Sequence, residues 1–388
     1  MIEKTISALA DQIRGVSYNK RDLHDKLDEN SIILLRANNI VEGKLNFRDV
    51  VYVDKNVVSA DQYLKDGDIL ISASSGSKKM VGKAASFHSK DKCTFGAFCK
   101  VVRPHDNIKE FLRIYFQSAT YRREISHLAL GANINNIRNE HINSLQVRVP
   151  DYRTRLQIIK VINTLQKIRD VRKQELKKLD ELIKARFVEM FGDPRCNNFN
   201  WKKSSIKKSC TLKSGKSLSV SIENEGGDIP YIKVKDMNNP KNIPYITTSS
   251  KFVKIENVEK QIFPPGTVIF PKRGGAIGTN KKRLTEVTIC ADLNIMGVIP
   301  NAEKLNSQYL FAYFKTIDLK TLNNGSSVPQ INNKDIEPLE ISLPPLSLQN
   351  EYANFVRQVD KSKFENIVYL NKTLSSKILS QIGDVIRD

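Results

Sequence analysis

The sequence contains two similar halves, and this internal repeat constrains the fold more than any single motif does. GANINNIRNEHINSLQVRVP, residues 131–150, is matched by GSSVPQINNKDIEPLEISLP, residues 325–344. Ile137 and Ile331 occupy equivalent places in these segments, 194 positions apart. The match predicts that one structural unit occurs twice in the chain.

The match continues toward the start of each half. DGDILIS at 66–72 is matched by PGTVIFP at 265–271. Further equivalent positions are Arg36 with Lys233 and Gly15 with Gly215. The offset drifts only from 194 to about 200, as expected when one copy of a duplicated domain gains a few loop residues.

Each half is followed by a segment with the pattern of a long helix. Residues 156–191 contain no Gly or Pro, and apolar residues recur in them at nearly helical spacing, as they do in residues 346–386. Each helix would be about 50 to 60 Å long. Long helices with a narrow apolar seam and charged flanks are marginal alone, so we expect the two to pack on each other.

The order of domain, helix, domain, helix fixes how these parts can be joined. The two helices can pair antiparallel only if the two domains lie at opposite ends of the pair. We therefore predict an α+β protein with two repeated globular α/β domains, joined by two long helices that form an antiparallel coiled coil with pseudo-two-fold symmetry. The predicted boundaries are 1–152 for the first domain, 153–192 for the central helix, 193–345 for the second domain and 346–388 for the C-terminal helix.

The formal charge of +20 favours a polyanionic partner, either nucleic acid or an acidic membrane surface. A solvated lysine-rich surface is the alternative reading of this charge. No apolar run approaches the about 20 residues that span a bilayer, and the first residues lack a signal-peptide pattern, so we expect a cytoplasmic protein without a membrane partner. The five cysteines form no C-x-x-C pair and the five histidines are dispersed, so no metal site is expected.

The stretch SSGSKKMVGKAA, residues 74–85, resembles the Walker A loop of NTPases. Five residues separate its glycines where the Walker A loop has four, and Ala84 stands where a hydroxyl should hold magnesium. The equivalent loop of the second half, KRGGAIGTNKKR at 272–283, has no Gly-Lys pair. Because the two loops share only glycines and positive charge, we expect them to approach a phosphate-rich partner rather than to catalyse. No paired His and carboxylate arrangement recommends itself as a catalytic site either.

The candidate DNA contacts fall into three sets in equivalent parts of the two halves. These sets are the cations of the two loops, two amide-rich segments and the matched cations near Arg36 and Lys233. Lysine and arginine would neutralise phosphates, while arginine, asparagine and glutamine would read base edges. The alternative for the amide segments is that they cap the strand or helix that follows. The full set is Arg36, Lys78, Lys79, Lys83, Asn135, Asn136, Arg138, Lys233, Lys235, Lys272, Arg273, Lys281, Lys282, Arg283, Ser326, Gln330 and Asn332.

With these features in place, the chain resembles the specificity (S) subunits of type I restriction–modification systems over essentially its whole length. The resemblance rests on the two-unit layout and on DGDILISASSGSKKMVGKAA and PGTVIFPKRGGAIG. It also rests on LPPLSLQ before the last helix and on the bridge LDELIKARFVEMFGDPRCNNFNW at 179–201. The first unit departs from the pattern, because VPDYRTRLQ replaces the Pro-Pro-Leu form of Pro344, Pro345 and Leu346.

The resemblance implies a function without catalysis. Each globular unit would be a target recognition domain that reads one half of a bipartite, asymmetric DNA sequence, and the helices would fix the spacer between the halves. Two methyltransferase subunits, which bind S-adenosylmethionine, would dock along the helices and methylate an adenine in each half, and restriction subunits would cleave unmodified DNA. This chain would bind no cofactor itself. The alternative from another class is a basic scaffold that bridges proteins or DNA without sequence preference.

Overall fold

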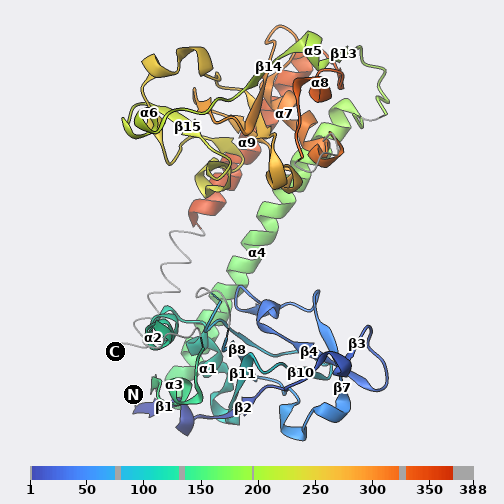
Figure 1. Cartoon of the computed structure of the whole chain (residues 1–388). Coiled ribbons are helices and arrows are strands. Elements are labelled where there is room, and N and C mark those ends of the chain that lie inside the picture. Colours follow the sequence, from blue (N-terminus) through green and yellow to red (C-terminus); the bar gives the residue numbers. More distant parts are fainter. Residues whose placement is uncertain (1, 75–79, 131–135, 195, 323–328, 370–388) are drawn as a thin grey trace. The chain divides into compact units, whose positions relative to one another are not determined.

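The computed structural model describes residues 2–74, 80–130, 136–194, 196–322 and 329–369 (Figure 1). The chain divides into two compact units. The first comprises Met1–Lys173 with Ile367–Asp388, and the second comprises Gln174–Asn366. This division falls inside a long helix, whereas the predicted domain boundaries lie near the two ends of that helix, and those boundaries stay a prediction.

The first unit is built on two four-stranded sheets. One is antiparallel throughout and has the order β2 (Ala10–Arg14), β11 (Cys99–Pro104), β8 (Ile69–Ser72), β9 (Ala84–Ser86). The other has the order β10 (Cys93–Phe95), β4 (Ser31–Leu35), β7 (Val51–Asp54), β3 (Leu23–His24), and its β10 and β4 are parallel. Two small antiparallel pairs complete the strands, β1 (Ile2–Thr5) with β12 (Gln146–Val149) and β5 (Ile40–Val41) with β6 (Lys44–Leu45).

Helices cover the first sheet of this unit. They are α1 (Lys109–Phe116), α2 (Ala119–Leu130) and α3 (Asn139–Asn143). α1 buries Phe111, Leu112, Tyr115 and Phe116 in one apolar cluster with Ile69 and other sheet residues. Removing these aromatic side chains from water is the main favourable term that holds α1 on the sheet.

The second unit repeats this plan. Its antiparallel core has the order β14 (Cys210–Ser214), β21 (Ile295–Pro300), β18 (Val268–Pro271), β19 (Arg283–Thr285), with β16 (Tyr245–Ile246) parallel to β19. A three-stranded sheet has the order β17 (Phe252–Val253), β15 (Ile229–Ile232), β20 (Cys290–Ala291), and its β15 and β20 are parallel. β13 (Lys203–Ser205) pairs with β22 (Glu340–Ser342). The helices are α5 (Ile206–Ser209), α6 (Val220–Asn224), α7 (Ser307–Thr316) and α8 (Asn333–Ile336).

The strand orders confirm the internal repeat. β2, β11, β8 and β9 correspond to β14, β21, β18 and β19, and the parallel pair β4 and β10 corresponds to β15 and β20. The predicted pair Gly15 and Gly215 has one structural role in both units. A Cβ on Gly15 would lie 2.2 Å from the carbonyl oxygen of Gly96, and one on Gly215 would lie 2.1 Å from that of Asp292. Both glycines therefore let one strand end approach another more closely than a side chain allows.

This close approach predicts a large effect of adding one methyl group. Gly215→Ala should destabilise the second unit by about 3 kcal/mol, because the Cβ would overlap backbone atoms that cannot rotate away. Gly275→Ala is the matched control, since a Cβ there meets nothing within 4 Å. Urea unfolding of both variants tests this, and equal unfolding free energies would contradict it.

The two long helices are α4 (Tyr152–Phe191) and α9 (Leu346–Tyr369). The predicted central helix is confirmed, while the rest of the predicted C-terminal helix, 370–388, lies outside the described residues. Within the second unit the two helices run antiparallel. Lys363 Nζ lies 2.8 Å from Asp180 Oδ1, and Arg186 lies 3.0 Å from Glu351. Residue numbers therefore increase along α4 in the direction in which they decrease along α9.

Apolar and aromatic side chains fill the seam between these helices. Phe187 and Phe191 of α4 lie with ring centroids 5.5 Å from Tyr352 of α9. Among the described residues, none of the helices combines the length and the apolar character that crossing a bilayer requires.

Candidate nucleic-acid interface

In each unit, one surface is formed where several strands end. We call residues 73–83 the first glycine loop and residues 272–282 the second. The first loop joins the antiparallel strands β8 and β9, and the second joins β18 and β19. A Walker A loop instead connects a strand to a helix, whose N-terminus holds the phosphate. The topology therefore argues against the NTPase reading of the first loop.

Each glycine loop lies beside the amide-rich segment of its own unit. The Ile137 N–H donates to the Ala73 carbonyl at 2.7 Å, and the Ile331 N–H donates to the Lys272 carbonyl at 2.9 Å. The bridges Ser74 with Asn136 and Arg273 with Gln330 extend these contacts. The two surfaces that the sequence suggests separately are thus one surface in both units.

The matched cations Arg36 and Lys233 follow the parallel strands β4 and β15. The Arg36 N–H donates to Asn39 Oδ1 at 2.7 Å, and the Lys233 N–H donates to Asp236 Oδ2 at 2.9 Å. The same local turn therefore places both cations, which supports their pairing by sequence.

Backbone hydrogen bonds join these strand ends to the glycine loops. In the first unit, the Gly96 N–H donates to the Leu35 carbonyl at 3.0 Å, and the Ala73 N–H donates to the Phe98 carbonyl at 3.0 Å. In the second unit the equivalent bonds are Asp292 N–H to the Ile232 carbonyl at 3.0 Å and Lys272 N–H to the Asn294 carbonyl at 2.7 Å. We call these strand ends, together with the residues that directly follow or adjoin them, the strand-end surface of each unit. It comprises 36, 73–74, 96–98 and 136 in the first unit, and 215–216, 233, 272–273, 292–294 and 330 in the second.

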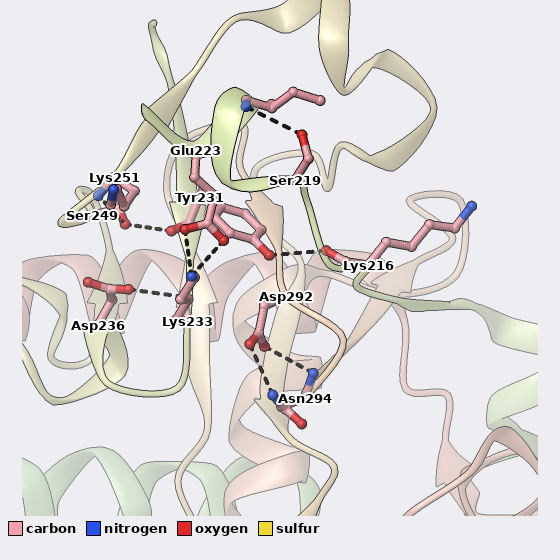
Figure 2. Close-up of polar contacts among 11 residues, drawn as sticks. Lys216, Ser219, Glu223, Tyr231, Lys233, Asp236, Ser249, Lys251, Asp292 and Asn294 are labelled. Atoms are coloured by element: carbon pink, nitrogen blue, oxygen red, sulfur yellow. Dashed lines mark hydrogen bonds and ion pairs between the residues drawn. The ribbon is translucent and has the colours of Figure 1, made fainter. Parts of the chain in front are cut away.

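Lys233 is held inside the second strand-end surface (Figure 2). Its Nζ lies 2.7 and 2.8 Å from the two carboxylate oxygens of Glu223, which comes from α6. The same ammonium lies 5.3 Å from the ring centroid of Tyr231, whose hydroxyl donates to the Lys216 carbonyl at 3.2 Å. Glu223 therefore neutralises Lys233 in this arrangement. Arg36 is less engaged, because its closest acid, Asp49, lies 3.6 Å away and is largely exposed.

Three cations of the second glycine loop region support the loop from within. Lys272 is 9% exposed and donates to Ser214 Oγ at 2.7 Å. Burial lowers the pKa of its ammonium, and the neighbouring Arg273 lowers that pKa further. Lys282 is 6% exposed and donates to Asn280 and to the Ile317 carbonyl, and burial lowers its pKa to about 8.

Arg283 is the third of these cations. It donates to the Lys282 carbonyl at 2.8 Å and to the Met237 carbonyl at 3.0 Å, and burial lowers the pKa of its guanidinium. A buried or half-buried cation whose N–H groups are bound to backbone carbonyls fixes the local backbone but has little access to a DNA phosphate.

Other predicted contact residues have side chains open to solvent. Asn136, Arg138, Lys235 and Arg273 are exposed, and Lys83, Lys281, Gln330 and Asn332 are half-buried. Gln330 donates to Asn332 Oδ1 at 2.7 Å, and Asn332 is the N-cap residue immediately before α8. Asn332 therefore stands at the position that the alternative for the amide segments expects, the N-cap of a helix. Lys78, Lys79, Asn135 and Ser326 lie outside the described residues.

Sequence reasoning missed Phe98, which is 73% exposed on the first strand-end surface. Its structural equivalence with Asn294 marks Phe98 as part of the repeated surface. This equivalence can be recognised only when the strand ends of the two units are aligned. Elsewhere in the first unit, an open groove of about 910 Å³ is lined by Lys83, Arg122 and Arg169 together with other residues. Among the described residues, no group of three or more His, Cys, Asp or Glu could hold a metal ion.

The chain matches the family model of the type I restriction modification DNA specificity domain twice, at residues 5–181 and 198–375. It is 27% identical over 383 residues to the type I restriction enzyme EcoKI specificity subunit of Escherichia coli strain K12, covering 92% of this chain and 80% of that protein. It is 36% identical over 180 residues to the StySPI specificity subunit of Salmonella potsdam, covering 46% of this chain and 39% of that protein.

Solved structures show the same fold. A chain from a structure of a type I R-M system aligns over 100% of this chain and 97% of its own length, with a TM-score of 0.59 and 14% identity. The S subunit of a type I restriction-modification system from M. genitalium aligns over 100% and 96%, with a TM-score of 0.55 and 14% identity. From the two family matches, the chain belongs to the type I restriction modification DNA specificity family, the non-catalytic sequence-recognition component of type I restriction–modification systems.

Proposed function

We propose that this chain reads a bipartite, asymmetric DNA target, one half with the strand-end surface of each unit. The observation that carries the proposal is that the same strand ends form this surface twice, with different side chains on it. Arg36, Asn136 and Phe98 in the first unit stand where Lys233, Gln330 and Asn294 stand in the second. One scaffold with two sets of side chains is suited to reading two different base sequences.

The charge of the chain supports DNA as the ligand. A net charge of +20 would attract the phosphate backbone, and exposed Arg138, Lys235 and Arg273 would neutralise phosphates near the bases being read. Lysines whose charge is paired or buried would instead stabilise the loops. These are Lys233, which is paired with Glu223, and the buried Lys272 and Lys282. The scaffold alternative has no comparable support, because it does not account for a repeated surface with differing side chains.

The chain would act by directing other subunits to the target. Two methyltransferase subunits would dock on the long helices and methylate an adenine in each half-site, using S-adenosylmethionine that they bind themselves. Restriction subunits would join the complex to cleave unmodified DNA.

Methylome sequencing of a host that expresses this chain with its methyltransferase partner tests the proposal. We expect adenine methylation at one split sequence and at no other. The purified complex should then bind a duplex of that sequence at least about a thousandfold more tightly than scrambled DNA at physiological salt. Equal binding to scrambled DNA would favour the scaffold alternative.

A further inference from the structure

Phe98 is an exposed aromatic side chain in the middle of the first strand-end surface. It stands in the turn between β10 and β11, and 73% of it is exposed to solvent. Single exposed apolar residues are common on proteins, so exposure alone carries no function. The rigidity of its turn and the residues around it distinguish Phe98.

Backbone hydrogen bonds hold the turn from several sides. The Gly96 N–H donates to the Leu35 carbonyl at 3.0 Å and the Ala97 N–H to the Val16 carbonyl at 2.9 Å. The Phe98 carbonyl accepts from the N–H groups of Ala73 and Ser74 at 3.0 and 3.1 Å. The ring is therefore carried on a fixed backbone, and only two side-chain torsions would have to be ordered when it meets a ligand.

The surroundings of Phe98 are polar and positively charged. Ser74, which binds the Phe98 carbonyl, also bridges to Asn136, an exposed amide. Arg36 follows the strand whose Leu35 carbonyl holds the turn. An exposed apolar ring on the same surface as an amide and a guanidinium suits the major groove, where thymine alone of the four bases presents a methyl group beside hydrogen-bonding edges.

The second unit places a different side chain at this point. Asn294 accepts the Lys272 N–H as Phe98 accepts the Ala73 N–H, so the two residues are structurally equivalent. Asn294 is half-buried, and its Nδ2 donates to Asp292 Oδ2 at 3.0 Å (Figure 2). One position of the repeated surface thus carries an apolar ring in the first unit and a fixed amide in the second.

We propose that Phe98 contacts the 5-methyl group of one thymine in the half-site that the first unit reads, and so specifies that base. This inference rests on the proposed function and adds to it a residue and the chemical group that the residue recognises.

The test removes the methyl group and the ring in turn. Duplexes are made with the target sequence that methylome sequencing identifies. In each duplex one thymidine of the first half-site is replaced by deoxyuridine, which lacks the 5-methyl group. Binding is measured with the complex of this chain and its methyltransferase subunits. At one position, deoxyuridine should weaken wild-type binding about fourfold, the loss of one buried methyl group. Phe98→Ala should bind the thymine and deoxyuridine duplexes equally, and Phe98→Leu should retain part of the difference.

Three controls separate this result from general damage. Leu27→Ala truncates another apolar side chain of the first unit, 54% exposed and outside the strand-end surface, and should leave the fourfold difference intact. Deoxyuridine in the second half-site should affect wild type and Phe98→Ala alike. The thermal unfolding midpoint of Phe98→Ala should equal that of wild type, since the side chain is exposed.

Three results would overturn the inference while leaving the proposed function standing. The first is a methyl dependence that persists in Phe98→Ala. The second is an equal loss on both duplexes with no methyl dependence in wild type, as expected for a ring wedged between base pairs. The third is weakened binding of the methyltransferase subunits with unchanged discrimination between bases. If wild type does not distinguish its target from scrambled DNA, the proposed function itself fails.

Discussion

Replacing residues 1–150 with those of a relative that has a different target should change one half of the methylated sequence completely and leave the other half unchanged. The expectation follows from the two strand-end surfaces, each of which is built from strand ends and loops of its own unit. The measurement is methylome sequencing of hosts that express the parental and the exchanged chains.

The reciprocal exchange, of residues 193–345, is the matched control and should change the other half only. A chimera that methylates neither parental half-site, although it is folded and bound to its methyltransferase, would count against modular reading. So would a first-unit chimera that keeps both parental halves.

Phe187→Ala should lower the unfolding free energy of the second unit by about 3 to 5 kcal/mol. The Phe187 side chain is 3% exposed. Its ring centroid lies 5.2 Å from that of Phe191, 5.6 Å from that of Tyr309 and 5.5 Å from that of Tyr352. These rings come from α4, α7 and α9, so the cavity left by the substitution would open where three helices meet. Denaturant unfolding followed by circular dichroism measures the change.

Val188→Ala provides a control on the adjacent residue of the same helix. Val188 is 51% exposed, so its truncation should cost less than about 1 kcal/mol. Equal losses for the two variants would mean that the aromatic cluster does not hold α4 to the second unit.

The repeat and the long helices could be predicted because both leave periodic signals in the chain. Apolar residues at helical spacing mark 156–191, and the structure has a helix at Tyr152–Phe191. Equivalent glycines such as Gly15 and Gly215 survive in both halves because each permits a close backbone approach that a side chain would block. These constraints concern single positions or one helix, so they can be recognised in the sequence without knowing which other residues pack against them.

The state of each cation could not be predicted in this way. Lys272 and Arg273 are neighbours in the sequence, yet Lys272 is buried against Ser214 of β14 while Arg273 is exposed. The difference depends on the order of strands in the sheet, which brings β14 and β18 to either side of β21. Charge alone marked all the lysines and arginines of the second glycine loop as equal candidates, and it passed over Phe98 because that residue carries no charge.

The pairing of first and last strands in each unit has a consequence for inheritance. β1 pairs with β12, and β13 pairs with β22, so each unit is entered and left at adjacent points. Sequence changes between those points can leave the path of the remaining chain unchanged where they keep the contacts with α4 and α9, because the chain enters and leaves each unit at the paired strands. A genetic crossover in the segment that encodes α4 would therefore join the first unit of one chain to the second unit of another. New combinations of half-sites would arise in this way without any new fold.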